Sequence, residues 1–219
     1  ELGLPKATIH RLFSTLEEAG YLQKEIDGRY YSAGRRLRMM STNILSSLRI
    51  RTARTAVLSS LAESIGETCN ISIPDREEMV YLDRVETKWP LRIQLPIGTR
   101  VPFYCTASGK MYLSSLRLPH LKAYISSIKL EARAPGTITD PERLLEEILE
   151  TRKRSFSQDN EEFMEGMIAI AVPIYDDQKR LVSTLSFHAP NQRLSLENAK
   201  THVTKLQEAS NQLTNLIQE

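Results

Sequence analysis

Six polar residues near the start of the chain share one face of a predicted helix and are of types that contact nucleic acid. The stretch Leu4–Gly20 reads LPKATIHRLFSTLEEAG. Pro5 suits a first helical turn, apolar residues repeat at helical spacing, and Gly20 stands where a C-cap residue would. The polar face carries Lys6, Thr8, His10, Arg11, Ser14 and Thr15. It suits base and phosphate contacts in a DNA major groove, although an ordinary amphipathic surface helix has the same pattern.

A predicted β-hairpin follows this helix and adds two basic residues. Asp27-Gly28 lies between Ile26 and Tyr30, and this dipeptide supplies the positive φ angles of a type I′ turn. Lys24 and Arg29 would lie on the hairpin, where they can reach phosphates. Helix and hairpin together predict a winged helix-turn-helix whose partner is double-stranded DNA.

A second group with chemical potential is Thr106-Ala107-Ser108-Gly109-Lys110, which we expect to begin a helix after an extended segment, Pro102–Cys105. Small and hydroxyl residues at a helix start leave backbone N–H groups facing outward, which suits a carboxylate or another anion. A P-loop is not supported, because its second glycine and its spacing are absent.

A third group lies on a predicted strand, Leu181–His188, which is expected to pair with the apolar strand Met167–Ile174 through a hairpin at 176–179. Alternation places Thr184, Ser186 and His188 on one face. Polar side chains on a face that should be buried predict the floor of a pocket. There His188 would either donate a hydrogen bond to a ligand or cap the strand end.

Several further elements are expected to position these groups. Two helices within residues 34–66 should meet around Arg49–Ala53, and strands at 68–73, 79–85 and 91–95 should form a meander. The region 116–153 reads as helical, with Thr139 and Glu142 as a capping box for its second helix. The acidic run 159–162 reads as a loop, and 198–218 as a final amphipathic helix.

At this point the chain resembles the IclR-type bacterial transcription regulators. The resemblance rests on segments in the family's order: 4–22, 31–34, 66–71, 80–86, 97–110, 159–167 and 170–176. It implies a DNA-binding regulator that forms a homodimer or homotetramer and binds a small effector. The DNA-binding candidates are Lys6, Thr8, His10, Arg11, Ser14, Lys24 and Arg29. The effector-binding candidates are Thr106, Ala107, Ser108, Gly109, Asp159, Met167, Ala169, Ser186 and His188. Ser155 departs from the family, which usually has a glycine there.

The resulting fold class is α+β. We expect the C-terminal part of a winged helix-turn-helix at 1–34, a linker helix at 35–51, and a GAF-like effector-binding domain with a mostly antiparallel central sheet at 52–219. Residues 1–3 look like the end of an earlier helix and its turn. The sequence is therefore expected to begin inside the DNA-binding domain, which would leave Leu12, Leu16 and Leu22 with an incomplete core.

Composition agrees with this division. The 219 residues carry a net charge of +2, but residues 1–51 hold nine Lys/Arg and five Asp/Glu, a balance of +4. A basic arm on a near-neutral body fits nucleic-acid binding. Two cysteines give no disulfide framework, no run is long enough to span a bilayer, and no ligand spacing predicts a metal or cofactor. A cytoplasmic protein without membrane contact is expected.

Two other classes of function remain open. An enzyme would need a nucleophile and a base, and Cys105 with His188 is the one pair worth considering, although nothing in the sequence joins them. A protein-binding scaffold would have its pocket filled by side chains. An open cavity at Ser108, Asp159, Ser186 and His188 would favour a sensor, whose effector we expect to be an organic acid, lactone, sugar acid or aromatic acid. A repressor is the expected role.

Overall fold

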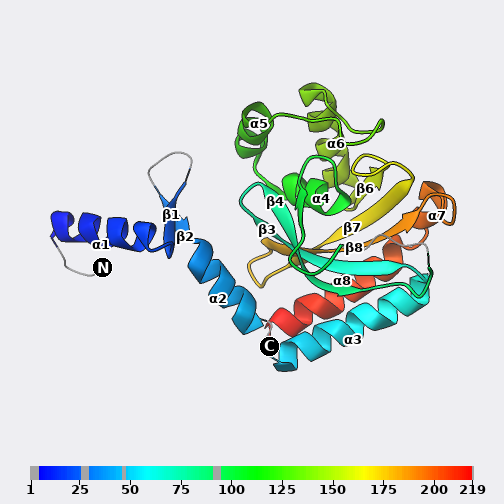
Figure 1. The fold of residues 1–219 in the computed structure, drawn as a ribbon, viewed down its shortest axis with the longest axis horizontal. Helices are drawn as coiled ribbons and strands as arrows, with labels where there is room; N and C mark the ends of the chain where they lie inside the picture. The colour runs from blue at the N-terminus through cyan, green and yellow to red at the C-terminus, as the bar shows by residue number, and fades with distance from the viewer. Residues whose placement is uncertain (1–4, 26–29, 46–47, 91–94, 219) are drawn as a thin grey trace. The chain divides into compact units, whose positions relative to one another are not determined.

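A computed structural model describes residues 5–25, 30–45, 48–90 and 95–218 of the chain (Figure 1). The chain divides into two compact units, Glu1–Arg51 and Thr52–Glu219, which are described separately below.

The first unit contains the predicted helix and hairpin. Helix α1 spans Lys6–Glu18, with Pro5 at its N-cap and Gly20 in the left-handed conformation just beyond its end. Strands β1, Leu22–Lys24, and β2, Tyr31–Ala33, pair antiparallel. The rings of Phe13 and Tyr31 pack edge to face, with centroids 4.9 Å apart, and join the helix to the hairpin. The Asp27-Gly28 turn and Arg29 lie outside the described residues.

Two helices follow, and the break between them differs from the prediction. Helix α2 spans Arg35–Leu45 and α3 spans Leu48–Ile65. Residues 49–53, where we expected the break, lie inside α3. Helical periodicity alone could not place it, because polar and apolar residues alternate at helical spacing on both sides.

The second unit is built on a six-stranded antiparallel sheet (Figure 1). The strands stand in the order β5-β4-β3-β8-β7-β6. Their bounds are Thr68–Asp75 for β3, Glu78–Val85 for β4, Arg100–Pro102 for β5, Ser157–Asn160 for β6, Met167–Tyr175 for β7 and Leu181–Pro190 for β8. The α+β class with a mostly antiparallel central sheet is therefore confirmed.

The structure shows two strands of the predicted meander, β3 and β4, and one strand that was not predicted, β5. Arg100–Pro102 pairs with β4, whereas 91–94 lie outside the described residues. Phe103–Cys105, expected to be extended, form a turn that leads into helix α4, Ala107–Ser115. The acidic run was also misread, because Asp159 and Asn160 belong to the edge strand β6.

Helices cover both faces of the sheet (Figure 1). On one face lie α3 and α8, Val203–Gln218, whose Leu58, Leu61, Leu206 and Leu213 pack against apolar residues of β3, β7 and β8. The final helix is preceded by a separate short helix, α7, Leu196–Lys200. On the other face lie α4, α5, Leu118–Ser127, and α6, Pro141–Arg154. The polar pocket floor therefore faces the α4 side.

The caps of helix α6 differ from the sequence prediction. Asp140, and not Thr139, is its N-cap residue, and the Asp140 carboxylate accepts a hydrogen bond from the Arg143 backbone N–H at 2.8 Å. Ser155 ends the helix in the left-handed conformation, with φ of 62°. This is the backbone conformation that glycine adopts most readily, so Ser155 keeps the turn at an energetic cost.

Ser155→Gly is therefore expected to raise the free energy of unfolding by about 0.5–1 kcal/mol, since relief of the left-handed strain exceeds glycine's entropic cost. Urea denaturation measures the change. Ser64→Gly is the matched control, because Ser64 is an exposed residue within α3. This variant should lose about 1 kcal/mol in the free energy of unfolding. Equal losses in both variants would contradict the assignment.

Candidate functional site

A row of polar side chains crosses the α4-facing side of the sheet. The Ser72 and Thr184 hydroxyl oxygens are 2.9 Å apart, and Asn70 Nδ2 lies 3.1 Å from His188 Nδ1. The Ser108 hydroxyl donates to Ser186 Oγ at 3.2 Å, which ties the start of α4 to β8. Leu185 and Phe187 alternate along β8 with Thr184, Ser186 and His188, and they pack in the core on the opposite face of the sheet. The alternation predicted for this strand is confirmed.

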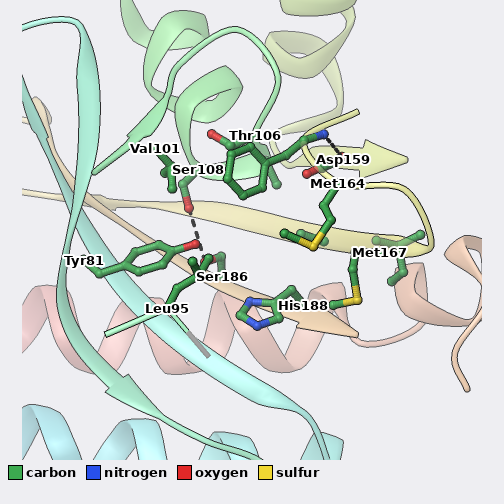
Figure 2. Close-up of a pocket in the computed structure, with 14 residues that line it drawn as sticks. Tyr81, Leu95, Val101, Thr106, Ser108, Asp159, Met164, Met167, Ser186 and His188 are labelled. Atoms are coloured by element: carbon green, nitrogen blue, oxygen red, sulfur yellow. Dashed lines mark hydrogen bonds between the residues drawn. The ribbon is translucent and has the colours of Figure 1, made fainter. Parts of the chain in front are cut away.

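Beside this row lies a small cavity of about 40 Å³ (Figure 2). Eight of the nine effector-binding candidates line it: Thr106, Ala107, Ser108, Asp159, Met167, Ala169, Ser186 and His188. These residues come from α4 and its N-cap, β6, β7 and β8, so one cavity gathers segments that are far apart in the chain.

The cavity has walls that the sequence did not reveal. They are Tyr81, Leu95, Val101, Phe163, Met164 and Ile168. Tyr81 lies on β4 and Val101 on β5, and strand alternation gave them no feature that distinguishes a pocket wall from core. Burial raises the pKa of Tyr81 to about 12, so its hydroxyl stays protonated at neutral pH.

Gly109 does not line the cavity and has a packing role instead. A Cβ atom built on Gly109 would stand 2.2 Å from Phe103 Cα and 2.4 Å from the Phe103 carbonyl oxygen. Helix α4 can therefore approach the preceding turn only because this residue has no side chain. The helix start is also partly occupied, since Thr106 Oγ1 accepts the Gly109 N–H at 3.1 Å.

Lys110 is fully buried and forms ion pairs with two glutamate residues. Its ammonium lies 2.5 Å from Glu162 Oε1 and 3.3 Å from Glu147 Oε1. Glu147 also accepts from Arg154 at 2.6 Å. Because the Lys110 charge is paired inside the protein, this residue is structural and does not face a ligand.

Asp159 is a buried carboxyl group in the cavity wall. Its Oδ1 accepts hydrogen bonds from the backbone N–H groups of Glu162, at 2.8 Å, and Phe163, at 3.3 Å. Burial, helped by the nearby Glu162 charge, raises the pKa of Asp159 from 3.8 to about 7. The carboxyl group is therefore readily protonated near neutral pH.

This shift predicts a pH effect on stability. A carboxyl group with a raised pKa in the folded state stabilises the fold below its unfolded pKa and loses that contribution as pH rises through the folded value. Relative to Asp159→Asn, which keeps the acceptor oxygen, the wild type should lose at least about 1 kcal/mol between pH 4 and pH 7. Urea denaturation across this range measures the difference, and parallel curves would contradict the assignment.

The pair considered for an enzyme, Cys105 with His188, lacks a reactive thiol. Cys105 is fully buried, and desolvation raises the pKa of its thiol to about 12. Desolvation also lowers the pKa of His188 to about 3, so the imidazole is neutral at physiological pH. Neither group carries the charge that thiolate catalysis requires.

The DNA-contacting candidates among the described residues lie on α1 and β1. Lys6, His10 and Arg11 are exposed on α1, and Thr8 and Ser14 are half-buried. Lys24 is exposed on β1, with its ammonium 5.8 Å from the centre of the Tyr31 ring. On the apolar side, Leu12 and Leu16 are 46% and 39% exposed.

A metal site and a membrane-spanning helix are both absent from the described part of the chain. No group of three or more His, Cys, Asp or Glu side chains there is arranged to hold a metal ion. No helix in the same ranges is long and apolar enough to cross a membrane.

A helix and wing with a basic exposed face, followed by an α+β unit with an internal polar cavity, define the class of DNA-binding regulators that carry a ligand-sensing domain. Comparison with known proteins identifies the family. The profile of the bacterial transcriptional regulator IclR C-terminal domain matches residues 42–215, and that of the IclR helix-turn-helix domain matches residues 1–25. The chain belongs to the IclR family of transcriptional regulators, which bind DNA and are not enzymes.

Individual relatives are also described as transcriptional regulators. The chain is 38% identical over 210 residues to a probable transcriptional regulator, SauR, of Cupriavidus necator, covering 96% of this chain and 83% of the relative. It is 27% identical to the transcriptional repressor IclR of Escherichia coli, covering 89% and 72%. The inducer-binding domain of PobR from Acinetobacter, solved with 3-hydroxy benzoic acid, superposes with a TM-score of 0.69 at 28% identity, covering 76% of this chain and 98% of that domain. These neighbours support the predicted GAF-like effector-binding domain.

Proposed function

We propose that this regulator is a repressor whose DNA affinity is controlled by a small carboxylate bound in the cavity beside Ser108, Ser186 and His188. The observation that carries the proposal is the cavity itself, because polar side chains from three elements converge on it. A relative described as a repressor supports the direction of control.

The size and chemistry of the cavity favour a small acid. A volume of about 40 Å³ has room for about three water molecules. An aromatic acid such as the one bound to the PobR domain would require the walls to move apart. Because Thr106 already occupies one N–H group of the helix start, the preference for an anion depends on the hydroxyl groups and His188 more than on the helix end.

Control of DNA binding then requires two arrangements of the protein with different affinities for the ligand. We propose that the protein acts in the cytoplasm as a homodimer or homotetramer, with paired DNA-binding units on half-sites about one helical turn apart. Residues 35–51 would serve as the linker between the DNA-binding and effector-binding parts.

The proposed DNA-contacting surface gives a testable prediction. Lys6→Ala and Arg11→Ala should each weaken DNA binding and reduce the slope of log affinity against log salt by about 1, because each removes one phosphate contact. Fluorescence anisotropy with an operator fragment at several salt concentrations measures this slope. Lys122→Ala, at an exposed position on α5, is the matched control. An unchanged slope in both α1 variants would contradict the assignment.

The ligand proposal is tested by thermal melting of the protein against a panel of small carboxylic acids. A ligand that binds only the native state raises the melting temperature as its concentration increases. Ser186→Leu places a larger side chain against the cavity and should abolish the rise, whereas Ser126→Leu, at an exposed position on α5, should preserve it. A rise that persists in Ser186→Leu would place the ligand elsewhere.

The open cavity also bears on the scaffold alternative. A scaffold would have this space filled by side chains, whereas the described residues leave a cavity with the buried polar side chains of Ser108, Asp159 and Ser186 on its walls. The cavity therefore favours a sensor.

A further inference from the structure

A chain of three polar side chains crosses the sheet behind the cavity. Arg84 on β4 donates from Nη1 to Asn70 Oδ1 at 2.9 Å, and Asn70 Nδ2 on β3 lies 3.1 Å from His188 Nδ1 on β8. Asn70 is fully buried. Of the three, only His188 lines the cavity, so Arg84 and Asn70 act on any ligand through it.

The chemistry of these groups fixes the position of the imidazole proton. A guanidinium group can only donate hydrogen bonds, so the Asn70 atom that faces Arg84 must be the amide oxygen. The amide nitrogen then faces His188 and can itself only donate. His188 Nδ1 must therefore accept, and the neutral ring carries its proton on Nε2.

The Nε2 atom is the part of His188 that remains available for a ligand. It is buried and has no hydrogen-bond partner among the residues that the structure describes. The ring itself lies among the side chains of the cavity, near Ser186 and Met167 (Figure 2). A buried donor without a partner is unfavourable, and a ligand oxygen would satisfy it.

We infer that Arg84 and Asn70 are positioning residues that hold His188 as a hydrogen-bond donor toward the cavity, so that the site selects a ligand with a carboxylate or carbonyl oxygen at that end over a ligand with an ammonium group. An ammonium group has only donors and would face the Nε2–H directly. The Ser108 and Ser186 hydroxyls can either donate or accept, so of these three cavity-lining side chains only His188 discriminates between the two ligand groups. The selectivity rests on the proposed function, whereas the proton position does not.

The proton position is tested without any ligand. Protonated and unprotonated imidazole nitrogens have widely separated nitrogen NMR shifts, so the His188 signals report the tautomer directly. We expect an Nε2–H tautomer in the wild-type protein. In Asn70→Asp the carboxylate can only accept, and a proton should appear on Nδ1. Asn211→Asp, at an exposed position on α8, should leave the His188 signals unchanged. A wild-type Nδ1–H tautomer would overturn the inference.

The selectivity is tested with acetate and ethylammonium, two probes of similar size and opposite hydrogen-bonding character. Acetate should shift the His188 Nε2 and attached proton signals in a saturable way, and ethylammonium should not. An equal or larger response to ethylammonium would overturn the selectivity. If neither probe shifts the signals while the Nε2–H tautomer is observed, the selectivity and the proposed carboxylate ligand are contradicted but the positioning roles of Arg84 and Asn70 stand.

Discussion

Lys110→Met is expected to lower the free energy of unfolding by about 3–5 kcal/mol at neutral pH. Lys110 is fully buried, and its ammonium is the charged partner of the buried Glu162 carboxylate. Methionine fills a similar volume but leaves that negative charge uncompensated, and Glu162 Oε2 already has no partner among the described residues. Glu147 is affected less, because Arg154 still pairs with it.

Urea denaturation at pH 7 measures this loss. Adding Glu162→Gln to Lys110→Met should restore much of the stability, because removing both charges removes the unpaired one. Lys200→Met is the matched control, since Lys200 pairs with the exposed Glu197 at 2.7 Å on the surface. That variant should lose no more than about 1 kcal/mol. Equal losses in Lys110→Met and Lys200→Met would contradict a buried structural charge.

Gly109→Ala has the second large expected effect, a loss of about 3 kcal/mol in the free energy of unfolding, at the upper end for overpacking. The added methyl group would stand 2.2 Å from Phe103 Cα, and a backbone atom cannot rotate away as a side chain can. Helix α4 would have to move, and with it Ser108 and its hydrogen bond to Ser186. The variant should therefore also lose the thermal response to the effector.

Denaturation and melting with ligand together test this prediction. Ser115→Thr adds one methyl group at the exposed end of the same helix and should change stability by less than about 0.5 kcal/mol. A Gly109→Ala protein with wild-type stability and an intact ligand response would show that α4 tolerates the methyl group, and the packing role assigned to Gly109 would be wrong.

The sequence allowed prediction of the features that depend on local pattern. Helix α1, the strands β7 and β8 and the alternation that places Ser186 and His188 on one face all follow from period and turn chemistry. The polar residues of β8 were recognisable because a buried face otherwise carries apolar side chains.

Features that depend on distant contacts were not predictable in the same way. Asp159 was expected in a loop because its neighbours are acidic, but pairing with β7 makes it part of an edge strand. Gly109 was predicted to line the pocket, but the close approach of the Phe103 backbone explains why a glycine stands there. Nothing in the local sequence of Asn70 or Arg84 indicates His188 as a partner, because strand order brings them together.

The central claim is that occupancy of the cavity beside Ser186 and His188 controls DNA binding. The most direct measurement is the affinity of the protein for an operator fragment, with and without the acid identified by melting, in the wild type and in Ser186→Leu. The acid should change the wild-type affinity by at least about fivefold and leave that of Ser186→Leu unchanged. An acid that binds the wild type without changing its DNA affinity, or that changes both proteins equally, would contradict the claim.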